Sequence, residues 1–271
     1  MFGKLVKYEF KSLGKWYLAL YGILTILSVV LGSWIQTIIR RSENHITTFN
    51  DNNWNMEGTM FVLAWVAFGL LVGGLLISTF FLVVARFQKS VYGRQGYLTM
   101  TLPVTGHQII LSKLLASIIW YILAGLMLVI SGFIITSIAL VPIFHEIEWH
   151  IAFSELTNIT YWPTIFQILF YYFTEMILGI LLAYFAISLG QLFKDHRTLL
   201  AIGFYLGIQF VIGTGEMIYF VTSTAMATTQ NSETFLNPFL PTPLFIIFNI
   251  ILAIGFYFGT HYIMTKRLNI Q

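Results

Sequence analysis

The sequence contains no cysteine, which excludes disulfides, a thiol nucleophile and a cysteine metal site. It also contains no GxxxxGK[ST] phosphate loop, no HExxH pair and no GxSxG nucleophile elbow. Its six histidines are scattered along the chain, a pattern more typical of surface or interfacial residues than of ligands. We therefore expect no catalytic residue, no metal and no cofactor bound by this chain, and we do not expect it to be an enzyme.

Charged residues are scarce as well. They make up 9% of the 271 residues, whereas a soluble domain carries about 25%. Hydrophobic residues make up 58%, and the mean hydropathy is +0.81. This composition predicts a protein that crosses a membrane several times. The pI of about 9.0 does not indicate nucleic-acid binding, because the basic residues lie at the ends of the apolar segments.

A helix needs about 20 apolar residues to cross the hydrocarbon core of a bilayer. Six segments meet this requirement, and their connections are too short to form separate soluble domains. We expect an all-α membrane protein in which residues 1–271 form a single transmembrane domain. The predicted spans are 17–39, 60–85, 108–141, 163–193, 198–222 and 243–264.

The basic residues predict the orientation of these spans. All of them except Arg40 and Arg41 precede span one, follow span six, or lie at the connections between spans two and three and between spans four and five. Six spans place these positions on one side, which the positive-inside rule makes cytoplasmic. Both termini should therefore lie inside. The acids of the opposite side are Glu43, Asp51, Glu57, Glu146, Glu148, Glu155 and Glu233.

Residues 1–15 predict an amphipathic helix that lies on the inner membrane surface instead of crossing it. Lysines at four positions occupy one side of this helix, where they can face anionic headgroups. The alternative is an ordinary basic tail. The apolar residues, which recur at helical spacing, are Phe2, Leu5, Val6, Phe10 and Leu13.

Two acids lie inside predicted spans, Glu175 near the middle of span four and Glu216 in the outer third of span five. A carboxylate is costly in lipid, so each is a candidate for the substrate path. The structural alternative is a protonated glutamate bonded to a neighbouring helix or extended toward the interface. For Glu216 this alternative is favoured, because Gly213 and Gly215 can break the helix and admit water.

Three GxxxG pairs predict close helix packing, and the alternative is chance, since glycine is common in membrane helices. The last two pairs favour packing of spans five and six. The pairs are Gly69 with Gly73, Gly203 with Gly207, and Gly255 with Gly259.

The loop over residues 87–106, between spans two and three, is unusually apolar for a cytoplasmic connection. Gly93 and Gly96 permit tight bends, and Thr105 with Gln108 forms a candidate capping box that begins span three. An exposed apolar cluster is typical of a docking site; the alternative is that the side chains lie back on the membrane. The candidate docking residues are Arg94, Tyr97, Leu98, Met100, Leu102 and Pro103.

The segment KSVYGRQGYLTMTLPVTGHQIILSKLLAS resembles the loop after the second span in ABC-2 type transporter permeases of Gram-positive bacteria. The opening MFGKLVKYEFKSLGKWYLALYG resembles the N-terminus of the same proteins. The two stretches cover about a fifth of the chain, and the six-span plan agrees with the rest.

The resemblance implies a multi-pass permease of the bacterial cytoplasmic membrane that works as a homo- or heterodimer with two ABC ATPase subunits. Those partners would bind ATP and Mg. Residues 92–103 would be the coupling helix that seats in the ATPase, with Tyr97, Leu98 and Leu102 as anchors. The implied function is ATP-driven export of an amphipathic substrate, such as an antimicrobial or other peptide, a drug or a lipid-like molecule.

Three other functions remain open. An ion-coupled secondary transporter would use Glu175 and Glu216, although neither has a basic partner and no inverted repeat is visible. An intramembrane enzyme would need a convergent set of His, Ser or Asp at one depth, and the sequence shows none. A non-transporting subunit that senses or sequesters a peptide would bind its ligand without ATP-dependent export.

Overall fold

The computed structural model describes residues 2–43, 56–93, 105–142, 154, 159, 162–193, 195–229 and 243–266. This part of the chain is helical and contains no strand. Its long helices are α1 (Phe2–Glu43), α2 (Met56–Phe87), α4 (Gly106–Ala139), α6 (Trp162–Gly190), α7 (Arg197–Thr229) and α8 (Pro243–Lys266), and a short π-helix, η1 (Gln88–Tyr92), continues α2.

The prediction of six membrane-spanning helices is confirmed at the level of length and composition. Six described helices are long and apolar enough to cross a membrane, and each coincides with one predicted span. The predicted spans 108–141 and 163–193 run slightly past their helices, because α4 ends at Ala139 and α6 at Gly190. This agreement has a simple cause. A segment that crosses the hydrocarbon core must be long enough to span it and must satisfy its backbone hydrogen bonds internally. An uninterrupted apolar helix meets both requirements.

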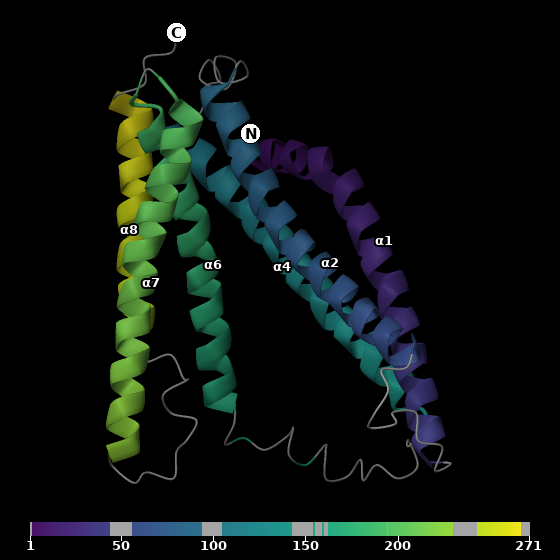
Figure 1. The fold of residues 1–271 in the computed structure, drawn as a ribbon. Coiled ribbons are helices and arrows are strands. Elements are labelled where there is room, and N and C mark those ends of the chain that lie inside the picture. Colours follow the sequence, from purple (N-terminus) through teal and green to yellow (C-terminus); the bar gives the residue numbers. More distant parts are fainter. Residues whose placement is uncertain are drawn as a thin grey trace. The chain divides into compact units, whose positions relative to one another are not determined.

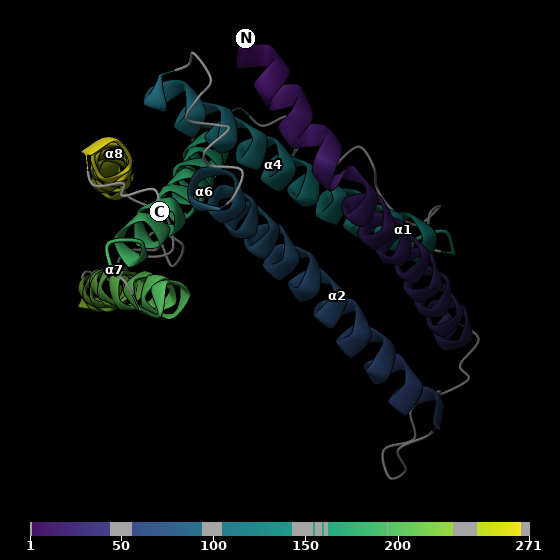
Figure 2. The ribbon, with the colours of Figure 1, turned by 90° about the horizontal axis from the view of Figure 1, so that it is seen from above.

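The first turns of α1 run at an angle to the rest of the helix, as Figure 1 shows, and Figure 2 shows α1 from above. Residues 1–15 were expected to form a helix distinct from the first span. The structure makes this stretch helical from Phe2 and continuous with the span. Its position on a membrane surface stays a prediction.

The chain divides into two compact units. The first consists mainly of Gly3–Leu82 and Ile119–Thr157, and the second mainly of Val83–Ile118 and Asn158–Gln271. The first unit therefore holds α1, most of α2 and the later part of α4. The second holds η1, the start of α4, and α6, α7 and α8.

Aromatic and small side chains hold the first unit together. The ring of Tyr17 stacks on that of Trp120, with centroids 4.1 Å apart, and both side chains are buried. One to two turns further along, Leu24, Leu75 and Ala124 form a second buried cluster that joins α1, α2 and α4. Dispersion contacts of this kind stabilise helix pairs in lipid, where apolar burial alone gives little.

In the second unit, α6 is the shared partner of α7 and α8 (Figure 1). Phe185 of α6 stacks on Phe256 of α8 at 5.3 Å between centroids. The turn from α6 to α7 is tight, since a Cβ atom on Gly190 would lie 2.6 Å from the Arg197 carbonyl oxygen. A side chain larger than hydrogen would force this turn open.

The predicted capping box at the start of α4 is confirmed. The Thr105 backbone N–H donates to the Gln108 side-chain oxygen, and the Gln108 N–H donates to the Thr105 hydroxyl, each at 3.4 Å. This reciprocal pair satisfies two donors that the first turn of the helix would otherwise leave without partners.

Candidate functional site

The six candidate docking residues, Arg94, Tyr97, Leu98, Met100, Leu102 and Pro103, lie outside the described residues. The structure does describe both ends of the segment that carries them, and it shows which helices hold these ends. All the contacts concerned lie within the second unit.

The end that follows α2 is fixed to α6. Phe87 stacks on Tyr184, with ring centroids 3.9 Å apart, and the Tyr92 hydroxyl donates to Ser188 Oγ at 2.7 Å. Tyr184 in turn shares a 2.9 Å hydrogen bond with Ser117 of α4. We call Phe87, Tyr92, Tyr184 and Ser188 the α6 anchor.

Backbone geometry ends the π-helix directly after this anchor. A Cβ atom on Gly93 would lie 2.6 Å from the Lys89 carbonyl oxygen, so the chain can leave the helix in this way only at a residue without a side chain. Gly93 was expected to permit a tight bend, and the close approach gives the physical reason.

The end that leads into α4 is fixed to α8. His107 Nδ1 lies 2.7 Å from the Tyr257 hydroxyl, and the His107 ring stacks on His261 with centroids 3.7 Å apart. We call His107, Tyr257 and His261 the α8 anchor. Sequence reasoning treated the histidines as scattered and missed this pair, which is separated by the whole of α6 and α7.

A second polar site lies among α6, α7 and α8. Asn249 Nδ2 donates to Glu175 Oε2 at 2.6 Å, and the Glu216 carboxyl is close enough to interact electrostatically with that of Glu175. Tyr171 interacts with both acids. We call Glu175, Glu216, Asn249 and Tyr171 the carboxyl cluster.

The carboxyl cluster has oxygen atoms that receive no hydrogen bond. Within the described residues, Glu216 Oε1 and Asn249 Oδ1 are buried and have no hydrogen-bond partner. The Asn249 side chain as a whole is 0% exposed. Phe245 of α8 lies beside Tyr171, with ring centroids 6.5 Å apart, and beside Tyr219, with ring centroids 5.0 Å apart. Buried acceptors of this kind are uncommon, because an unsatisfied polar group in apolar surroundings is costly.

The sequence singled out both acids but gave no reason to place them together, and it missed Asn249. The available signal was a lone amide in the apolar stretch FIIFNIILAIG. Polar residues within a span usually face a neighbouring helix. The sequence of α8 alone does not show that Asn249 pairs with Glu175 of α6.

Of the six glycines in GxxxG pairs, the structure brings only Gly259 against another helix, where a Cβ atom would lie 2.6 Å from Phe185 Cε2 of α6. A Cβ atom on any of the others would meet nothing within 4 Å. Those five are Gly69, Gly73, Gly203, Gly207 and Gly255.

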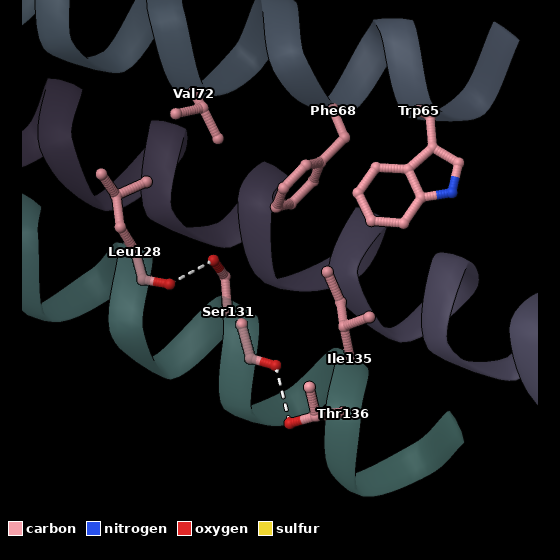
Figure 3. Close-up of a pocket in the computed structure, with 8 residues that line it drawn as sticks. Trp65, Phe68, Val72, Leu128, Ser131, Ile135 and Thr136 are labelled. Carbon is pink, nitrogen blue, oxygen red and sulfur yellow. Dashed lines mark hydrogen bonds between the residues drawn. The ribbon is translucent and has the colours of Figure 1, made fainter. Parts of the chain in front are cut away.

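A groove of about 360 Å³ lies between α2 and α4 in the first unit (Figure 3). Its hydroxyls bond to their own helix, Ser131 to the Leu128 carbonyl at 2.8 Å and Thr136 to the Gly132 carbonyl at 3.0 Å. The groove therefore presents an apolar surface. It is lined by Trp65, Phe68, Val72, Leu128, Ser131, Gly132, Ile135 and Thr136.

Among the described residues, no group of three acidic or histidine side chains is placed to hold a metal ion. The six apolar helices define the chain as a multi-pass membrane protein. No protein family, no curated protein and no solved structure was found that matches it.

Proposed function

We propose that this chain is the membrane-spanning permease subunit of an ATP-driven exporter. It pairs with a second permease chain and works with separate ATPase subunits that bind ATP and Mg. The two permease chains form the path for an amphipathic substrate, such as a peptide, a drug or a lipid-like molecule. Its membrane is the bacterial cytoplasmic membrane, with both termini and the 87–106 loop on the ATPase side.

The observation that carries the proposal is the fixing of both ends of the apolar loop to transmembrane helices. In the α6 anchor, which holds the end that follows α2, the Tyr92 hydroxyl lies 2.7 Å from Ser188 Oγ. In the α8 anchor, which holds the other end, His107 Nδ1 lies 2.7 Å from the Tyr257 hydroxyl. A force applied to a loop held in this way reaches α6 and α8 directly. A coupling element needs this property, whereas a loop that merely lies on the membrane does not.

The broad apolar surface of the helices also supports a second chain or lipid as a partner. Only 6% of the span in α2 and 6% of the span in α7 are buried within the chain. Helix faces that the described helices of the same unit leave uncovered contact lipid, the other unit or another protein.

The proposal is tested by isolating the tagged chain from its native membranes in mild detergent. We expect an ATPase to copurify in equal amount with the wild type, and to be lost from Tyr97→Ala/Leu98→Ala although that variant still inserts in the membrane. The matched control is Leu206→Ala/Phe210→Ala, which removes a leucine and an aromatic ring that are 60% and 74% exposed on α7.

Isolation of the chain alone, from membranes in which the ATPase is present, would contradict the exporter proposal. Such a result would favour an ion-coupled secondary transporter. The observation behind this second candidate is that Glu175 and Glu216, distant in sequence, interact in the structure. That candidate predicts transport by the reconstituted chain alone, driven by an ion gradient and abolished in Glu175→Gln.

A further inference from the structure

We propose that the stacked imidazole rings of His107 and His261, which we call the histidine clasp, form a pH-sensitive contact between the start of α4 and the end of α8. The clasp is closed when the pair carries one proton or none, and it opens when each ring carries a proton. The inference does not rest on the proposed exporter function, because it concerns a contact within the chain that can be followed without an ATPase or a substrate.

The first turn of α4 meets the last turns of α8 at the clasp. The rings of His107 and His261 are nearly parallel, at 11°, with centroids 3.7 Å apart. The Tyr257 hydroxyl lies 2.7 Å from His107 Nδ1. Gly106 permits the close approach of the two helices, because a Cβ atom there would lie 3.0 Å from Met264 Cε and 3.4 Å from His261 Nε2.

The geometry of the clasp favours a proton over a metal ion as its ligand. A neutral imidazole binds a metal through a ring nitrogen, whose lone pair lies in the plane of the ring. Because the planes of His107 and His261 are stacked face to face, the lone pairs of the two rings cannot point at one ion. His107 Nδ1 is also occupied by the Tyr257 hydroxyl. A proton needs only one ring nitrogen.

One proton is compatible with the closed clasp. An imidazolium on the face of a neutral ring is attracted to it, as other cations are to aromatic rings. The Tyr257 hydroxyl also suits both states of His107, because it donates to a neutral Nδ1 and accepts from a protonated Nδ1–H. Both contacts therefore persist when the pair binds its first proton.

A second proton places two like charges face to face, and neither α4 nor α8 contains an acid that could offset them. Glu175 of α6 is bonded to Asn249, which lies about three turns of α8 away from His261. Like charges at this separation repel each other, so the doubly protonated stack separates. The other titratable and charged groups of the three helices are Lys113 and Tyr121 on α4, Tyr171, Tyr172 and Tyr184 on α6, and Tyr257, Tyr262 and Lys266 on α8.

Opening of the clasp acts on one end of the apolar loop only. The clasp holds the end that leads into α4, whereas the other end is held by the bond of Tyr92 to Ser188 in the α6 anchor. The α6 anchor contains no histidine. Acidification therefore frees the loop from α8 and leaves it fixed to α6.

The test measures the distance between α4 and α8 in the purified full chain at different pH values. Because the chain has no cysteine, Leu111→Cys/Ile254→Cys carries two spin labels at exposed positions and no others. Double electron–electron resonance gives the distribution of label distances. We expect the short-distance population to be lost between about pH 8 and about pH 4.5, a range that spans the ordinary titration of histidine.

Three variants of the labelled chain identify the group that responds. His261→Gln cannot carry the second charge, so its label distances should not change over this pH range. His107→Gln gives the same comparison if His261→Gln does not fold. The matched control is His196→Asn, which removes an exposed histidine from the turn between α6 and α7 and should respond as the wild type does. Asparagine suits this position, where φ is 51°.

Two results would overturn the proposal. The first is a set of wild-type label distances that stays constant with pH. The second is an equal response in His261→Gln, because the group that binds the proton would then lie outside the clasp.

Discussion

Asn249 is a fully buried amide in the second turn of an apolar helix, and its bond to Glu175 is the polar contact that joins α8 to α6 at this depth. A hydrogen bond to a carboxyl group contributes about 1.5–3 kcal/mol in soluble proteins. The net value in membranes is smaller, because the unfolded chain in lipid finds other polar partners. The contribution of Asn249 is thus measurable but modest.

We expect Asn249→Leu to lower the free energy of unfolding in detergent by about 1–2 kcal/mol. Thermal or denaturant unfolding measures the change. The matched control is Thr260→Val, because Thr260 is equally buried on α8 but its hydroxyl donates to the Phe256 carbonyl of its own helix. Equal losses in the two variants would mean that the contact between helices contributes nothing specific.

At the scale of elements, α6 and α8 pack closely because a glycine faces an aromatic ring. A Cβ atom on Gly259 would lie 2.6 Å from Phe185 Cε2, and the Phe185 ring cannot shift freely because it stacks on Phe256 at 5.3 Å. One turn earlier, Gly255 has no atom within 4 Å of the Cβ position. The two glycines of one GxxxG pair therefore have different roles.

These two positions give a matched pair of substitutions. Gly259→Ala should lower the free energy of unfolding by about 1–3 kcal/mol, because an added methyl overpacks the contact. Gly255→Ala should leave it unchanged or raise it by up to about 1 kcal/mol, since alanine favours the helix. Unfolding curves in detergent distinguish the outcomes. A destabilised Gly255→Ala with an unaffected Gly259→Ala would contradict the observed packing.

At the scale of the whole molecule, the distribution of basic residues predicts that the turn between α6 and α7 and the connection before α6 lie on opposite sides of the membrane. The absence of cysteine makes this directly testable, because a single introduced thiol is the only one in the chain. Asp195 lies in that turn, and Ile159 precedes α6 with 81% of its surface exposed.

We expect Ile159→Cys to react with a membrane-impermeant maleimide in intact cells, and Asp195→Cys to react only after the cells are opened. The cysteine-free wild type is the control for background labelling. The reverse pattern would invert the orientation and place the 87–106 loop on the outside, where it could not reach a cytoplasmic ATPase.

The sequence by itself determined the six helices, because the length of an apolar run and its hydrogen-bonding needs in lipid are local properties. It also determined the capping box of Thr105 and Gln108, whose partners are three residues apart. The sequence identified Glu175 as a polar residue within an apolar helix, but it did not identify Asn249 as the hydrogen-bond partner of Glu175.

Only the tertiary structure decided which polar side chains meet. Asn249 lies 74 residues from Glu175, and Tyr257 lies 150 residues from His107. Helices that are apolar on every side show no polar stripe that would reveal the face turned toward a neighbour. The facing surfaces are set by the fit of particular side chains, such as Phe185 against Gly259, and that fit exists only when both helices are in place.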